Sequence, residues 1–166
     1  IISDLFTIKY HFNNLENLSI SWFGDMNNVL FSYFELLALF PEIKLNVFTH
    51  KDIYVNKKIQ FPISQNINFY FDLSSKIINQ SDCIMTDVFT SMNDIDSTKE
   101  KILKSFQVNK KIMDLTNATC VFMHCLTANK GAEVTEDVLN SDKSIVMKQA
   151  KNRLIAQKGI MKWLNI

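Results

Sequence analysis

The hydrophobic positions of this chain alternate between short runs typical of buried β-strands and longer stripes with helical spacing. Apolar runs rich in β-branched and aromatic residues predict strands at residues 18–23, 43–49, 67–71, 82–89 and 120–126. Between them, apolar and capping patterns predict helices at residues 29–40, 73–80, 97–106 and, opening at Thr135, 135–140. The pattern therefore predicts strands and helices in regular alternation.

Both ends of the chain are predicted to be helical. The first residues form one helical stripe, so a helix is expected from residue 1 onward, with this apolar set: Ile1, Leu5, Ile8 and Phe12. The terminal segment, residues 145–166, contains a long helix over 148–164, whose expected apolar stripe is Ala150, Leu154, Met161 and Leu164.

Alternating strands and helices with connections of this length predict an α/β fold. We expect a three-layer sandwich in which helices cover both faces of a mostly parallel, Rossmann-like sheet. The chain has 166 residues and is 47% hydrophobic, which is enough for the core of one domain spanning residues 1–166. In such sheets ligands bind beyond the carboxyl ends of the strands, so polar residues that follow strands are the candidate site.

The charge and cysteine content exclude several classes of function. Eighteen basic and seventeen acidic side chains leave a net charge of +1, which gives no footprint for nucleic acid or an anionic membrane. The lysine pairs Lys57-Lys58 and Lys110-Lys111 are expected to be solvated. Three cysteines without a CxxC pattern argue against a disulfide scaffold or zinc site, and the longest apolar run is too short to span a bilayer. We expect a cytoplasmic protein without metal or cofactor.

The first strand ends in the stretch GDMNN, residues 24–28. The second and third glycines of a dinucleotide-binding turn are missing, so NAD binding is not expected. What remains is a tight turn at Gly24 and two carboxamides, Asn27 and Asn28, at the start of a helix. These side chains suit the carboxylate and amine of an amino acid, although one of them as a simple helix cap is an equal alternative.

Two further strand ends carry candidate binding residues. After the fourth strand, Asp87 is suited to a substrate ammonium, with Ser91 and Met92 beside it; an ordinary turn is the alternative. The last strand ends at His124, Cys125 and Leu126, and alternation along a strand points the first two side chains in opposite directions.

That opposition argues against a thiolate–imidazolium dyad. We expect Cys125 to face a ligand and His124 to be structural, whereas a lone buried cysteine is more often a small hydrophobe. On the terminal helix, the planar fork of Arg153 suits a phosphate or carbamoyl oxygen if it faces the same crevice; otherwise it is a surface charge.

Together these segments resemble one family. The stretches GDMNN, TDVFTSM, FMHCLTANKGAEVTEDVL and QAKNRLIAQKGIM are similar, in that order, to the carboxyl-terminal half of ornithine carbamoyltransferases. The most specific part is His-Cys-Leu followed by Gly-x-Glu-Val-Thr, since the sister aspartate carbamoyltransferases lack the cysteine. The resemblance implies transfer of a carbamoyl group from carbamoyl phosphate to the δ-amine of L-ornithine, giving L-citrulline and phosphate, with no cofactor.

The resemblance also implies roles for individual residues. Ornithine would be bound by Asn27, Asn28, Asp87, Ser91 and Met92, and the catalytic pair would be Asp87 and Cys125. The carbamoyl-phosphate side would be bordered by Cys125, Leu126 and Arg153. The sequence departs from the family at Thr127, which replaces a proline, and at Phe89, where a tryptophan is usual.

The largest departure is the expected absence of the amino-terminal carbamoyl-phosphate domain. The chain would then be an ornithine-binding domain that is inactive alone, and monomeric although full-length members form homotrimers. Two alternatives stay open: a carbamoyltransferase for another amine, such as putrescine or an acylated ornithine, and a non-catalytic amino-acid-binding remnant.

Overall fold

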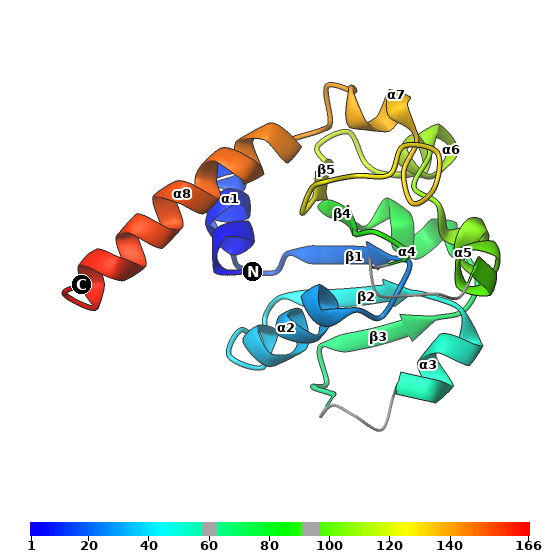
Figure 1. Cartoon of the computed structure of the whole chain (residues 1–166), viewed down its shortest axis with the longest axis horizontal. Coiled ribbons are helices and arrows are strands. Elements are labelled where there is room, and N and C mark those ends of the chain that lie inside the picture. The colour runs from blue at the N-terminus through cyan, green and yellow to red at the C-terminus, as the bar shows by residue number, and fades with distance from the viewer. Residues whose placement is uncertain (58–62, 91–96) are drawn as a thin grey trace.

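The computed structural model describes residues 1–57, 63–90 and 97–166, which form an α/β domain around a parallel sheet (Figure 1). The sheet has the order β3-β2-β1-β4-β5 and every neighbouring pair is parallel. Its strands are β1 (Ser19–Phe23), β2 (Lys44–Phe48), β3 (Ile67–Tyr70), β4 (Cys83–Thr86) and β5 (Val121–His124). All five predicted strands are thus confirmed, and the last two end earlier than predicted, just before Asp87 and Cys125.

The helices differ more from expectation than the strands do. Those described are α1 (Ile2–Phe12), α2 (Asn28–Leu37), α3 (Lys51–Lys57), α4 (Ser75–Asn79), α5 (Ser97–Leu103), α6 (Lys110–Leu115), α7 (Glu136–Leu139) and α8 (Val146–Trp163). The short helices α3 and α6 were not predicted. Each is too short to show a helical stripe, and α6 is stabilised instead by its cap, where Asn109 Oδ1 accepts from Ile112 N at 3.2 Å.

Helices cover both faces of the sheet, as the predicted sandwich requires. Trp22 and Met85 are partners in the sheet and share one face, where the Tyr33 hydroxyl of α2 lies 3.1 Å from the Met85 sulfur. Ser21 points to the opposite face, and its hydroxyl lies 2.6 Å from that of Ser81, just after α4. All residues of β4 and β5 are buried, so neither face of this half of the sheet is open to solvent.

The two terminal helices pack side by side (Figure 1). In α1 the predicted residues Leu5 and Ile8 are buried, but the predicted stripe of α8 is wrong: Leu154, Met161 and Leu164 are all about half exposed. The buried face of α8 is instead formed by Val146 and Gln149. Hydrogen bonds of its side chain to His124 N and to Asp4 place Gln149 inward, and hydrophobic spacing does not reveal them. In the described ranges no helix is long and apolar enough to cross a membrane.

Candidate functional site

A cavity of about 870 Å³ opens at the carboxyl end of the sheet, between α1, α2 and α8. It contains five of the eight predicted site residues: Asn28, Asp87, Cys125, Leu126 and Arg153. They come from the start of α2, the residues directly after β4 and β5, and α8. The tertiary structure therefore brings together residues that are up to 125 positions apart in the sequence, counted from Asn28 to Arg153 (153 − 28).

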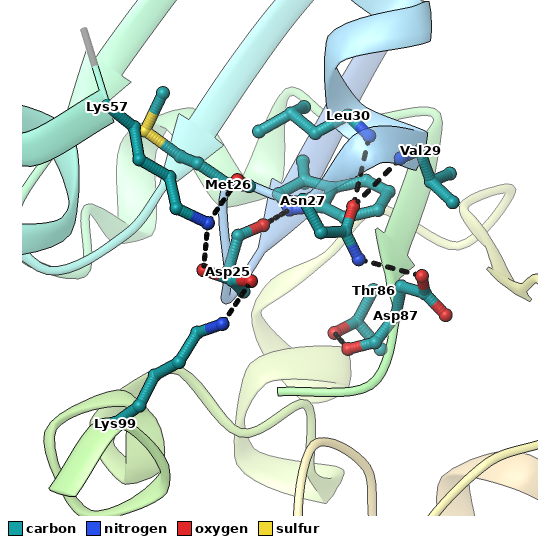
Figure 2. A network of polar contacts seen from close by, with 10 residues as sticks. Asp25, Met26, Asn27, Val29, Leu30, Lys57, Thr86, Asp87 and Lys99 are labelled. Carbon is teal, nitrogen blue, oxygen red and sulfur yellow. Dashed lines mark hydrogen bonds and ion pairs between the residues drawn. The ribbon is translucent and has the colours of Figure 1, made fainter. Parts of the chain in front are cut away.

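Asn27 joins the start of α2 to Asp87 (Figure 2). Its Oδ1 accepts hydrogen bonds from Val29 N at 3.1 Å and Leu30 N at 3.2 Å, which makes it the N-cap of α2. Its Nδ2 donates to Asp87 Oδ2 at 2.7 Å. Of the two predicted alternatives, Asn27 is thus the helix cap. It is not one of the residues that line the cavity, but it contacts Asp87, which is, and its neighbour Asn28 lines the cavity.

The turn before Asn27 is anchored by a buried charge cluster that the sequence did not reveal (Figure 2). Asp25 is 3% exposed, and its carboxylate lies 2.7 Å from Lys99 Nζ and 3.4 Å from Lys57 Nζ. Lys57 Nζ also donates to Met26 O at 2.8 Å. The prediction that Lys57 is merely solvated is wrong: it pairs with the buried Asp25 carboxylate, which needs cationic partners. Lys58 lies outside the described residues.

The same turn packs closely against the segment after β4. Gly24 has φ +116°, and a Cβ built on it would lie 2.4 Å from Cε1 of the buried Phe89 ring. Glycine is thus required here by both conformation and space, which confirms the predicted tight turn. Together, the Gly24 and Asn27 contacts hold the residues around Asp87 against the end of β1.

His124 stabilises the end of β5 from inside the protein, as predicted. Its Nδ1 accepts from Leu126 N at 2.9 Å, so its Nε2 carries the proton and faces Glu133 Oε1 at 3.2 Å. Both side chains are fully buried. Glu133 also accepts from Asn129 N, and Leu126 has φ +51° and is joined to Thr127 by a cis peptide bond. Glu133 was missed as a contact because an isolated glutamate in a loop gives no sequence signal for burial.

Cys125 faces the cavity on the other side of the strand end and is half-buried. Burial, with a smaller contribution from Asp4 and Asp87, raises the pKa of its thiol to about 12, against the opposing effect of Arg153. The thiol is therefore neutral at physiological pH and does not act as a thiolate nucleophile. Cys83 and Cys120 are buried, and all three thiols are free.

Two buried polar residues of the cavity wall were also missed. Asp4 of α1 and Gln149 of α8 line the cavity although they are only 4% and 2% exposed. Ser91 and Met92 lie outside the described residues. Within the described part of the chain, no group of three or more histidine, cysteine and acidic side chains is arranged to hold a metal ion.

Comparison with known proteins identifies the family that shares these features. Residues 16–164 match the sequence profile of the aspartate/ornithine carbamoyltransferase, Asp/Orn binding domain. An ornithine carbamoyltransferase from Rhodopseudomonas palustris is 36% identical over 167 residues, which cover 98% of this chain and 53% of the relative. One from Methanocaldococcus jannaschii is 36% identical over 174 residues, covering 99% of this chain and 56% of the relative.

Solved structures agree with the sequence relatives. Ornithine carbamoyltransferase from Thermus thermophilus superposes with a TM-score of 0.79 at 32% identity, over 96% of this chain and 52% of that protein. The enzyme from Pyrococcus furiosus gives the same TM-score and identity over 96% and 53%. The chain thus spans about half the length of the curated relatives it matches.

Proposed function

The chain belongs to the aspartate/ornithine carbamoyltransferase family through its Asp/Orn-binding domain, and we propose that it is the ornithine-binding domain of an ornithine carbamoyltransferase. The proposed reaction is attack of the δ-amine of L-ornithine on the carbonyl carbon of carbamoyl phosphate. A C–N bond forms, the C–O bond to phosphate breaks, and the amine loses a proton, giving L-citrulline and phosphate. Residues 1–166 form the proposed domain.

One observation carries this proposal: a carboxylate, a carboxamide, a thiol and a guanidinium converge in one cavity. Asp87 is the group proposed to bind an ornithine ammonium, because a half-buried carboxylate forms strong charge-assisted hydrogen bonds. Asn28 sits at the first turn of α2, where the helix dipole favours the substrate carboxylate. Ser91 and Met92 are proposed to complete this half of the pocket.

The carbamoyl half of the proposed site is formed by Cys125, Leu126 and Arg153. The guanidinium of Arg153 would stabilise negative charge developing on the carbamoyl oxygen as the amine attacks. Cys125, neutral at physiological pH, offers a polarisable sulfur beside the reacting amine without a competing charge. Asp87 is the nearby base proposed to assist loss of the amine proton.

Turnover is proposed to require more than this domain. The curated relatives are about twice as long as the matched region, and the resemblance assigns carbamoyl-phosphate binding to their other half. Positioning of two reactants accounts for roughly 7–11 kcal/mol of a barrier, so we expect the 166-residue chain alone to be inactive. We also propose that this chain is monomeric, in a cytoplasmic enzyme whose full-length relatives form trimers.

Calorimetric titration of the chain with L-ornithine tests the proposal, with putrescine, N-acetyl-L-ornithine and L-aspartate as competing ligands. We expect selective binding of L-ornithine that is lost in Asp87→Asn and retained in Asp142→Asn, a matched change at an exposed acid. Tighter binding of putrescine or N-acetyl-L-ornithine would mean that this ligand, and not L-ornithine, is the substrate of the domain. A folded chain that binds none of the four ligands would contradict an ornithine-binding domain.

A further inference from the structure

The outer edge of β5 is paired by side-chain and loop groups in place of another strand. β5 ends the described sheet, yet Phe122 N donates to Lys143 O at 2.8 Å and Ile145 N donates to Phe122 O at 3.0 Å. Two residues further along, His124 N donates to Oε1 of Gln149 at 2.9 Å. Buried backbone N–H groups need such partners, and here a side chain on α8 supplies the last one.

Gln149 is itself held in one orientation by Asp4. Its Nε2 donates to Asp4 Oδ1 at 2.8 Å, and the two side chains are 2% and 4% exposed. His124 N can only donate, and Oδ1 of Asp4 is the acceptor in its contact with Gln149. The amide oxygen must therefore face His124 and the amide nitrogen must face Asp4. The chain of bonds runs from α1 through α8 to the backbone directly before Cys125.

We propose that Gln149 is a positioning residue for Cys125, oriented by Asp4, and that it sets the place of the thiol in the ornithine site; this inference rests on the proposed function. The cavity is lined by Gln149, Asp4 and Cys125 together. A movement of the Gln149 side-chain amide therefore changes the wall of the cavity. His124 N is the last amide of β5 and donates across the outer edge of the sheet to α8, and one peptide unit separates it from Cys125.

The charges around this pair allow a selective test. Several titratable and charged groups lie near Asp4 and Gln149. They are the Ile1 amino group 3.4 Å from Asp4 Oδ2, Tyr33 on α2, Cys83 on β4, Asp87 after β4, His124 and Cys125 at the end of β5, and Arg153 on α8. Burial raises the pKa of both Tyr33 and Cys125, so neither carries charge near neutral pH. A carboxylate introduced at position 149 would therefore meet the Asp4 carboxylate directly.

The variant Gln149→Glu makes use of this arrangement. Above neutral pH the two carboxylates repel, because like charges at hydrogen-bond distance cannot both remain ionised without cost. On acidification they share one proton, which restores a donor between positions 149 and 4. Asn152→Asp is the matched control: Asn152 also bonds α8 to α1, through Nδ2 to Thr7 Oγ1 at 3.0 Å, but does not contact β5.

Ornithine affinity is measured by calorimetry between pH 5.5 and 8.5, and each variant is compared with the unaltered chain at the same pH. We expect Gln149→Glu to bind at least tenfold more weakly at pH 8 and to approach the unaltered chain at pH 5.5. Asn152→Asp should stay within twofold at every pH. A pH-independent ratio for Gln149→Glu, or an equal loss in Asn152→Asp, would overturn the proposal.

A second readout keeps this inference separate from the proposed function. Amide resonances of His124 and Cys125 are followed in two-dimensional ¹⁵N–¹H spectra of the folded variants across the same pH range. In Gln149→Glu both should shift with the shared proton, whether or not ornithine binds. If the unaltered chain binds no ornithine but these shifts occur, the proposed substrate fails and the positioning contact stands. If the shifts are absent, the positioning role itself is wrong.

Discussion

Asn27 performs two tasks whose energies can be separated by substitution. Asn27→Ala removes the cap of α2, at a cost of about 1 kcal/mol. It also removes the hydrogen bond to the Asp87 carboxylate, which is worth about 1.5 kcal/mol because the acceptor is charged but half exposed. Serine is an equally good cap but is too short to donate to Asp87. We therefore expect unfolding free energies to fall by about 2.5 kcal/mol for Asn27→Ala and about 1.5 kcal/mol for Asn27→Ser.

Thermal denaturation followed by circular dichroism resolves this difference, since 1 kcal/mol shifts the Tm of a chain of this size by about 2–4 °C. Ornithine affinity, measured by calorimetry, should fall equally in both variants because both release Asp87. Asn109→Ala, which removes the cap of α6, is the control. It should lower the unfolding free energy by about 1 kcal/mol and leave ornithine affinity unchanged. Unchanged ornithine affinity in Asn27→Ser would refute the role of Asn27 in orienting Asp87.

Three further predictions follow from the same region. Gly24→Ala should lower the unfolding free energy by about 2–4 kcal/mol in urea titration, because the positive φ and the overpacked Cβ add; a change below 1 kcal/mol would contradict the close contact. Alkylation of Cys125 by iodoacetamide, followed by mass spectrometry, should be slow at pH 7.5, and its rate should rise about tenfold per pH unit up to pH 9.5. The reason is that only the thiolate reacts and the pKa of the thiol is about 12. A rate that levels off near pH 8.5 would show an ordinary thiol. Lys99→Met should destabilise by about 3 kcal/mol, because it removes the nearer of the two lysines that pair with the buried Asp25 among the described residues. Lys110→Met, in an exposed pair, should change stability by less than about 1 kcal/mol. Equal effects of the two substitutions would contradict burial of the Asp25 charge.

Several features of the site follow from short-range patterns in the sequence. The strands could be predicted because buried parallel strands are continuous apolar runs, and the turn at Gly24 because few residues tolerate its conformation. The opposite orientation of His124 and Cys125 follows from the two-residue period of a strand. The rule that ligands bind at the carboxyl ends of parallel strands then predicts that Asp87 and Cys125 meet.

Several polar contacts that hold the site could not be predicted, because they join residues far apart in the chain. Lys57 and Lys99 look like any surface lysines until Asp25 is found buried between them. Gln149 lies outside the predicted apolar stripe of α8, and its partner Asp4 lies 145 residues away. No local pattern of hydrophobic spacing distinguishes such a residue from one that faces solvent.

The sequence by itself therefore determined the strands, their alternation with helices and the residues at their carboxyl ends, because propensity and hydrophobic period act over a few neighbouring positions. Only the tertiary structure decided which polar groups become buried, since burial of Asp4, Asp25 or Gln149 is stable only when a distant partner arrives to form its hydrogen bond or ion pair. Those partners appear once the sheet is assembled, and they fix the positions of Asp87 and Cys125 to which the chemistry is assigned.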